Sequence, residues 1–182
     1  SFCVTFLDSI HIHLFDKFLK LKMQQYNISR SSSFYAIGLS YKKADADIRG
    51  HFSLSDDARL ALLKQAKEND IESLVVTSTC NRTEIYGFAQ HPFQLIQLLC
   101  ENTRGTVEEF QKVAYIYKNK DAIAHMFRKG SGLDSQILGD FEIISQLKSS
   151  VRISKKFALL NHFTERLVNA VIQASKRIKT ET

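Results

Sequence analysis

The chain of 182 residues contains no tryptophan, one proline and only three cysteines. Cys3, Cys80 and Cys100 form no Cys-x-x-Cys pair and no metal-ligand cluster, and their odd number argues against a disulfide scaffold. This cysteine usage is typical of a reducing compartment, so we expect a cytoplasmic protein. No uninterrupted apolar run approaches the ~20 residues that a transmembrane helix needs, which excludes a membrane-spanning protein.

Evidence for a metal or nucleotide site is equally scarce. His11 and His13 alternate near the N-terminus, but no third ligand lies within reach in the sequence, so no metal is expected. The segment "GSGLDS", residues 130–135, begins like the glycine fingerprint of a dinucleotide-binding loop. A nucleotide loop is not favoured here, because Ser135 occupies the third glycine position and a predicted helix, not a strand, precedes the segment.

The net charge of +6 is concentrated at the C-terminal end. Residues 147–182 contain eight Lys or Arg and two Glu, a difference that equals the charge of the whole chain. A polyanion such as RNA is one partner that this stretch could bind. The other interpretation is a long surface helix that carries lysines on its solvated face. Charge alone leaves both open.

Residues 1–33 are interpreted as an N-terminal extension, with translation starting at Met23. Met23 opens a polar stretch that leads into the first predicted strand, and Asp8 and Asp16 interrupt the apolar segment before it, so a secretory signal is not indicated. The alternative is a targeting extension that ends in the serine run, residues 31–33. It is less favoured because arginine is nearly absent before Arg30.

The hydrophobic pattern predicts short strands interleaved with helices. Strands are expected at 34–40, 72–78, 83–89 and 113–118, with helices at 53–70, 92–102 and 121–129. The first helix places Leu60, Leu63 and Ala66 on one face. The second places Phe93, Ile96 and Leu99 on one face with Cys100, which is expected in the core. From residue 161 an apolar helical stripe continues without glycine or proline, which predicts a long packing helix. The fold class is therefore α+β followed by an all-helical segment.

Cys80 is the candidate reactive group. It falls on the tip of the hairpin predicted between strands 72–78 and 83–89, with Arg82 two residues later. The thiolate form is favoured by nearby positive charge and by backbone N–H groups exposed at a turn. A small buried residue at a strand end is the other interpretation, and spacing alone does not decide between them.

Three segments resemble the glutamyl-tRNA reductase family in order and spacing: "TSTCNRTEIYGFA", "GSGLDSQILGDFEIISQLKSS" and "ASKRIKTET". The resemblance runs from Phe34 to Thr182. It implies a ferredoxin-like catalytic domain over 34–155 and the start of a spinal helix and linker over 156–182. It also implies that the NADPH-binding and dimerisation domains of the family are absent from this chain.

The resemblance implies a thioester mechanism. Cys80 would attack the ester of glutamyl-tRNA, and NADPH, bound by the missing domain, would reduce the thioester to glutamate-1-semialdehyde for tetrapyrrole synthesis. His125 would assist catalysis. Substrate contacts would come from Thr79, Asn81, Arg82, Ser135, Asp140, Phe141, Glu142 and Gln146.

Two segments depart from the family pattern. "DFE" at 140–142 replaces the usual Glu-Pro-Gln, and "YKKAD" at 41–45 replaces the usual His-Lys-Thr-Ala-Pro. Two other functions stay open, an RNA-binding module without chemistry and a thiol esterase that uses Cys80 and His125. Glutamyl-tRNA is the expected partner. The full-length enzyme is expected to be a homodimer, whereas the fragment alone can be monomeric.

Overall fold

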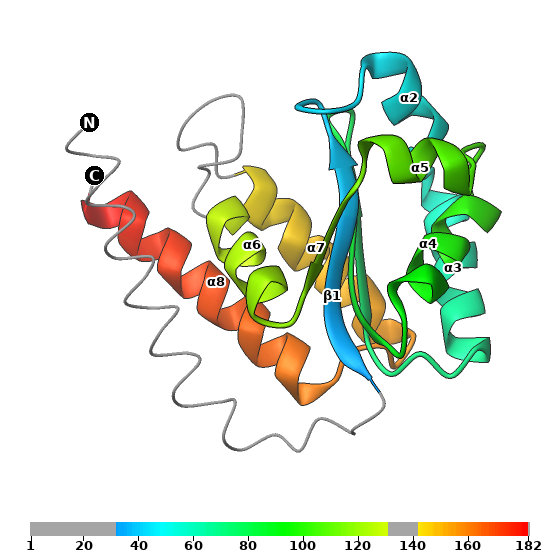
Figure 1. The fold of residues 1–182 in the computed structure, drawn as a ribbon. Helices are drawn as coiled ribbons and strands as arrows, with labels where there is room; N and C mark the ends of the chain where they lie inside the picture. The colour runs from blue at the N-terminus through cyan, green and yellow to red at the C-terminus, as the bar shows by residue number, and fades with distance from the viewer. Residues whose placement is uncertain (1–31, 131–141, 182) are drawn as a thin grey trace.

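The computed structural model describes residues 32–130 and 142–181. Along this part of the chain, strands and helices alternate before three consecutive helices close the structure (Figure 1). The elements are β1 (Ser33–Ser40), α2 (Ala46–His51), α3 (Asp56–Glu68), β2 (Leu74–Ser78), β3 (Arg82–Ala89), α4 (Pro92–Glu101), α5 (Val107–Val113), β4 (Tyr115–Lys118), α6 (Lys120–Gly130), α7 (Glu142–Lys156) and α8 (His162–Glu181).

The four strands form one antiparallel sheet in the order β2-β3-β1-β4. β1 pairs with β3 on one side and with β4 on the other, so Ile37 lies opposite both Ile85 and Ile116. Because β3 lies between β1 and β2, the helices between β1 and β2 form a split βαβ crossover, which is the ferredoxin-like arrangement. The predicted fold class is confirmed.

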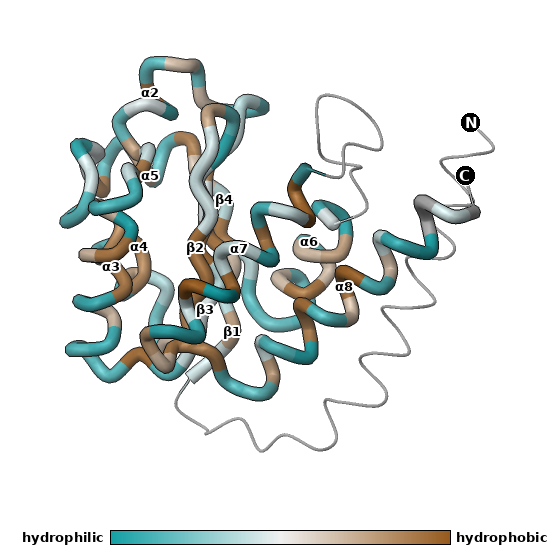
Figure 2. Tube along the Cα trace, turned by 180° about the vertical axis from the view of Figure 1, so that it is seen from behind, coloured by the Kyte–Doolittle hydropathy of each residue, from teal (hydrophilic) through white to brown (hydrophobic). Residues whose placement is uncertain are grey.

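The sheet is covered on both faces. Alternate residues of a strand point to opposite sides, so Tyr35, Ile37 and Leu39 pack in one core with α3 and α4. Phe34 and Ala36 pack in a second core with α6, α7 and α8. Figure 1 shows the two groups of helices on either side of the sheet, and Figure 2 shows apolar residues along the strands between them.

Local capping explains where the helices begin. Ser55 precedes α3, and its hydroxyl accepts a hydrogen bond from Ala58 N at 3.2 Å. Pro92 occupies the first turn of α4, where a missing N–H costs nothing. These starts agree with the predicted helices. The sequence pattern missed α2 and α5, which are only six and seven residues long and begin after Asp45 and Thr106.

Two members of the predicted apolar helix faces are exposed. Leu60 and Phe93 are 42% and 44% exposed, whereas Leu62 and Leu95 are fully buried. Two residues along a helix of 3.6 residues per turn point to nearly opposite sides. The buried face of each helix therefore includes Leu62 or Leu95. Leu60 and Phe93, at the N-terminal end of each predicted face, point to solvent.

The predicted long C-terminal helix is present as α8. Phe163, Leu167 and Val171 are buried against α6 and α7, so the start of this helix belongs to the second core. In the described part of the chain, no helix is both long and apolar enough to cross a membrane. Met23, His11 and His13 lie outside the described residues, and the division of the chain near residue 155 stays a prediction.

Candidate active site

Cys80 lies on the hairpin tip between β2 and β3, as predicted, and its side chain is exposed to solvent. Residues 79–81 form the tip, and Cys80 is exposed. Backbone bonds close it, from Thr79 N to Arg82 O at 2.8 Å and from Tyr41 N to Asn81 O at 3.1 Å. The Thr79 hydroxyl accepts from Asn81 N at 3.3 Å. The alternative in which Cys80 is a small buried residue is therefore wrong.

Arg49 ties the tip to α2 and was missed by sequence reasoning. Its Nε donates to the Cys80 carbonyl at 3.2 Å, and its Nη1 donates to the Ala44 carbonyl at 2.8 Å. Because both hydrogen bonds come from one planar guanidinium, they hold the backbone carbonyls of Cys80 and Ala44 in a fixed relation. Arg49 therefore restrains the backbone that carries the candidate nucleophile. An arginine near the end of a six-residue helix gives no pattern from which this could be predicted.

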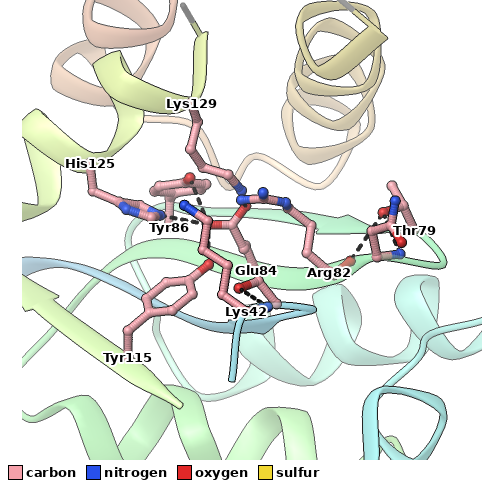
Figure 3. Close-up of polar contacts among 10 residues, drawn as sticks. Lys42, Thr79, Arg82, Glu84, Tyr86, Tyr115, His125 and Lys129 are labelled. Atoms are coloured by element: carbon pink, nitrogen blue, oxygen red, sulfur yellow. Dashed lines mark hydrogen bonds and ion pairs between the residues drawn. The ribbon is translucent and has the colours of Figure 1, made fainter. Parts of the chain in front are cut away.

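A buried carboxylate lies at the centre of the site. Arg82, Glu84 and Tyr86 alternate along β3 and share the face that α6 covers. Glu84 is 1% exposed, and its Oε2 lies 2.8 Å from His125 Nε2. The hydroxyls of Tyr86, at 3.1 Å, and of Tyr115 donate to the same oxygen. Figure 3 shows these side chains converging on Glu84.

Cations balance this carboxylate. Lys129 Nζ contacts Glu84 Oε1, and Arg82 Nη1 lies 3.9 Å from the same oxygen (Figure 3). Lys129 and Arg82 are themselves 4% and 8% exposed. Burial of an ionised group is costly unless it is paired and hydrogen-bonded, so Glu84 and its cations depend on one another. Sequence reasoning missed Glu84 and Lys129. Two signals could have found them, because Glu84 is an acidic residue within an apolar strand and Lys129 lies on the apolar face of α6.

A glycine makes room for this convergence. Gly38 of β1 lies between Glu84 of β3 and Tyr115 of β4 in the sheet register. A Cβ at Gly38 would lie 2.7 Å from the Tyr115 hydroxyl and 2.8 Å from Glu84 Cγ. Such contacts are too short for any side chain. Glycine therefore allows Tyr115 to reach across β1 to the carboxylate.

Arg82 lines two cavities, one on each side of the buried cluster. The smaller, of about 20 Å³, also includes Glu84, Lys129 and Gln146. The larger, of about 280 Å³, includes His125, Tyr115 and Tyr117. The structure thus brings together Arg82 with Gln146 and Arg82 with His125, three of the predicted residues.

The remaining predicted residues are less central. Glu142 is exposed in the first turn of α7. Ser135, Asp140 and Phe141 lie outside the described residues. His125 is 4% exposed and contacts Glu84, whereas Cys80 lies on the exposed tip, two residues before Arg82. A catalytic partnership of Cys80 and His125 stays a prediction.

Cys100 provides a contrast with Cys80. It is half-buried in α4 and packs against the first core, close to its predicted core position. Burial, followed by the charges of Glu108, Glu109 and Glu101, raises the pKa of its thiol. A raised pKa disfavours the reactive thiolate. Of the two described cysteines, Cys80 is the one placed for chemistry.

The site thus combines an exposed thiol at a hairpin tip of a ferredoxin-like sheet with a buried carboxylate and its paired cations, a combination that suits thiol chemistry. Comparison with known proteins identifies the family. Residues 37–182 match the family described as the N-terminal domain of glutamyl-tRNAGlu reductase, and the chain belongs to this family.

Relatives and a solved structure agree. The glutamyl-tRNA reductases of Christiangramia forsetii and Flavobacterium psychrophilum are 72% and 68% identical to this chain over 160 residues. These alignments cover 88% of the chain but only 38% and 39% of the relatives. The glutamyl-tRNA reductase structure from Methanopyrus kandleri superimposes with a TM-score of 0.68 at 22% identity, over 82% of this chain and 35% of that one. It confirms the fold.

Proposed function

We propose that this chain is the part of a glutamyl-tRNA reductase that receives the glutamyl group from tRNA on Cys80. The observation that carries the proposal is the exposed position of Cys80 at the tip, two residues before the buried Arg82. The names of the relatives supply the substrate, glutamyl-tRNA, and the structure supplies a thiol that a bulky substrate can reach.

The first step needs only residues of this chain. The Cys80 thiolate attacks the ester carbonyl, and the bond between carbonyl carbon and ribose oxygen breaks. The ribose oxygen takes up a proton from water and leaves as the terminal hydroxyl of the tRNA. The glutamyl group is then held as a thioester. Arg82, with its planar fork of donors, suits the side-chain carboxylate of glutamate.

Reduction of the thioester by NADPH is the expected second step, which would yield glutamate-1-semialdehyde. The described residues do not fit a dinucleotide, since their sheet is antiparallel and lacks a strand followed by a glycine-rich helix start. No hydride step is derived from them. The relatives extend well beyond the matched region, and the cofactor is expected to bind there.

Substitution of the nucleophile tests the proposal. Cys80→Ser should abolish formation of a glutamyl-enzyme, because a serine hydroxyl is far less ionised than a thiol at neutral pH. Intact-mass spectrometry after incubation with glutamyl-tRNA would detect a glutamyl group on the wild type and none on the variant. Cys100→Ser is the matched control and should retain the adduct. Rates in Cys80→Ser above a tenth of wild type, a barrier change under about 1.4 kcal/mol, would contradict a nucleophilic role.

A further inference from the structure

The larger cavity beside Arg82 has an unusual lining. Its volume is about 280 Å³, near the lower end of the ~300–1,000 Å³ typical of ligand sites. Four cations line it, namely Lys42 and Lys43 from the turn after β1, Arg82, and Arg128 of α6. None of its described lining residues is acidic. The nearby Glu84 is buried and does not line the cavity. The cavity therefore favours an anion.

Aromatic rings form one wall of the same cavity. The rings of Tyr115 and Tyr117 stack with centroids 5.5 Å apart, and the His125 ring lies 4.9 Å from Tyr117. Arg128 lies over the Tyr117 ring at 5.9 Å. Cations alone are enough to bind a phosphate, so the aromatic rings indicate a ligand that also has a flat ring. Aromatic and guanidinium planes beside cations are the combination that binds single-stranded nucleotides, by stacking on the base and pairing with phosphate.

The position of the cavity fits the ester chemistry. In an acylated tRNA the amino acid is joined to the terminal ribose, so the last nucleotide must lie beside the group that is attacked. Arg82 lines both cavities, and the smaller one, with Gln146, is far too small for a nucleotide. Of the two, the larger cavity is therefore the one beside Arg82 that can hold a nucleotide.

We propose that the cavity formed by Lys42, Lys43, Tyr117 and Arg128 binds the 3′-terminal nucleotide of the acylated tRNA. This inference rests on the proposed function, because it places the leaving group of that reaction. The base stacks on the Tyr117 and Arg128 planes, and the two lysines contact the phosphate. The acceptor end is thereby held with its ester facing the hairpin that carries Cys80.

Binding of a CCA trinucleotide to the complete protein tests the site directly. Fluorescence anisotropy of the labelled trinucleotide should show that Tyr117→Leu weakens binding by about tenfold, while Tyr117→Phe, which keeps the ring, does not. Lys43→Ala should weaken binding several-fold and reduce its salt dependence, because one phosphate contact is lost. Lys118→Ala is the matched control. Lys118 is exposed on β4 and does not line the cavity.

Acyl transfer then separates this inference from the proposed function. Tyr117→Leu should raise KM for glutamyl-tRNA about tenfold and Lys43→Ala several-fold, yet both should leave transfer from a small glutamyl thioester without a nucleotide unchanged. Lys43 lies in an exposed turn, so its variant tests the site even if Tyr117→Leu fails to fold. Wild-type trinucleotide affinity and KM in the Lys43 variant, or an equal loss in Lys118→Ala, would overturn the site. Failure of transfer from both substrates in the wild type would instead overturn the proposed function.

Discussion

At the scale of single residues, the site depends on one carboxylate that does not touch solvent. Glu84 accepts hydrogen bonds from two tyrosines and contacts His125 and Lys129, so it orders side chains from β3, β4 and α6 at once. Its ionised form needs Lys129, and Lys129 in turn needs Glu84. The same carboxylate also faces Arg82, whose Nη1 lies 3.9 Å from Glu84 Oε1.

Removal of one partner should therefore cost more than removal of both. Glu84→Gln leaves Lys129 buried without its counter-charge, and we expect the free energy of unfolding to fall by about 3–5 kcal/mol. Adding Lys129→Met should recover much of this loss, because the second variant removes the stranded charge. Chemical denaturation of the two single variants and the double variant measures the coupling. Additive losses would show that the two groups do not stabilise one another.

At the scale of elements, caps and hydrophobic patterns in the sequence predicted the four strands and the helices α3, α4, α6 and α8, since these signals are local. Helix α7 was not predicted as a separate helix. Helices α2 and α5 escaped because six or seven residues leave too little periodicity to detect. The site was only partly predictable for a different reason. Cys80 and Arg82 are neighbours in sequence, whereas Glu84 and Lys129 meet only after α6 packs on β3. Resemblance to the family pointed to His125 but not to Lys129.

The two short helices are joined by a contact that should be sensitive to acid. His51 Nδ1 of α2 lies 2.7 Å from Glu109 Oε2 of α5, and this hydrogen bond lowers the pKa of the Glu109 carboxyl below its usual 4.5. A lowered pKa in the folded state means that the contact stabilises the protein above pH 4.5 and is lost as pH falls through the lowered value.

Thermal unfolding of His51→Ala should therefore show a lower Tm than the wild type at neutral pH. The difference should shrink as the pH falls below about 4.5, where Glu109 takes up its proton in both proteins. His162→Ala, at the exposed start of α8, serves as the control and should show no such convergence. A difference that stays constant down to pH 3 would assign the loss to packing rather than to the ionised contact.

At the scale of the whole molecule, the described residues present an exposed thiol, but their antiparallel sheet does not fit a dinucleotide. Apolar cores cover both faces of the sheet within the described residues, so we expect this part of the chain to fold. If the glutamyl group reaches Cys80 as proposed, the thioester meets water instead of hydride. Its slow hydrolysis should then release free glutamate and deacylated tRNA.

We therefore expect this length of chain to act as a glutamyl-tRNA esterase whose products do not change when NADPH is added. Incubation with radiolabelled glutamyl-tRNA, with and without NADPH, followed by separation of glutamate from glutamate-1-semialdehyde, makes the measurement. The Cys80→Ser variant corrects for spontaneous hydrolysis of the ester. NADPH-dependent semialdehyde would mean that these residues bind the cofactor after all, against the antiparallel sheet and its lack of a glycine-rich strand-to-helix turn. Deacylation no faster than in the variant would contradict the role of Cys80, because transfer of the glutamyl group to Cys80 itself releases the tRNA.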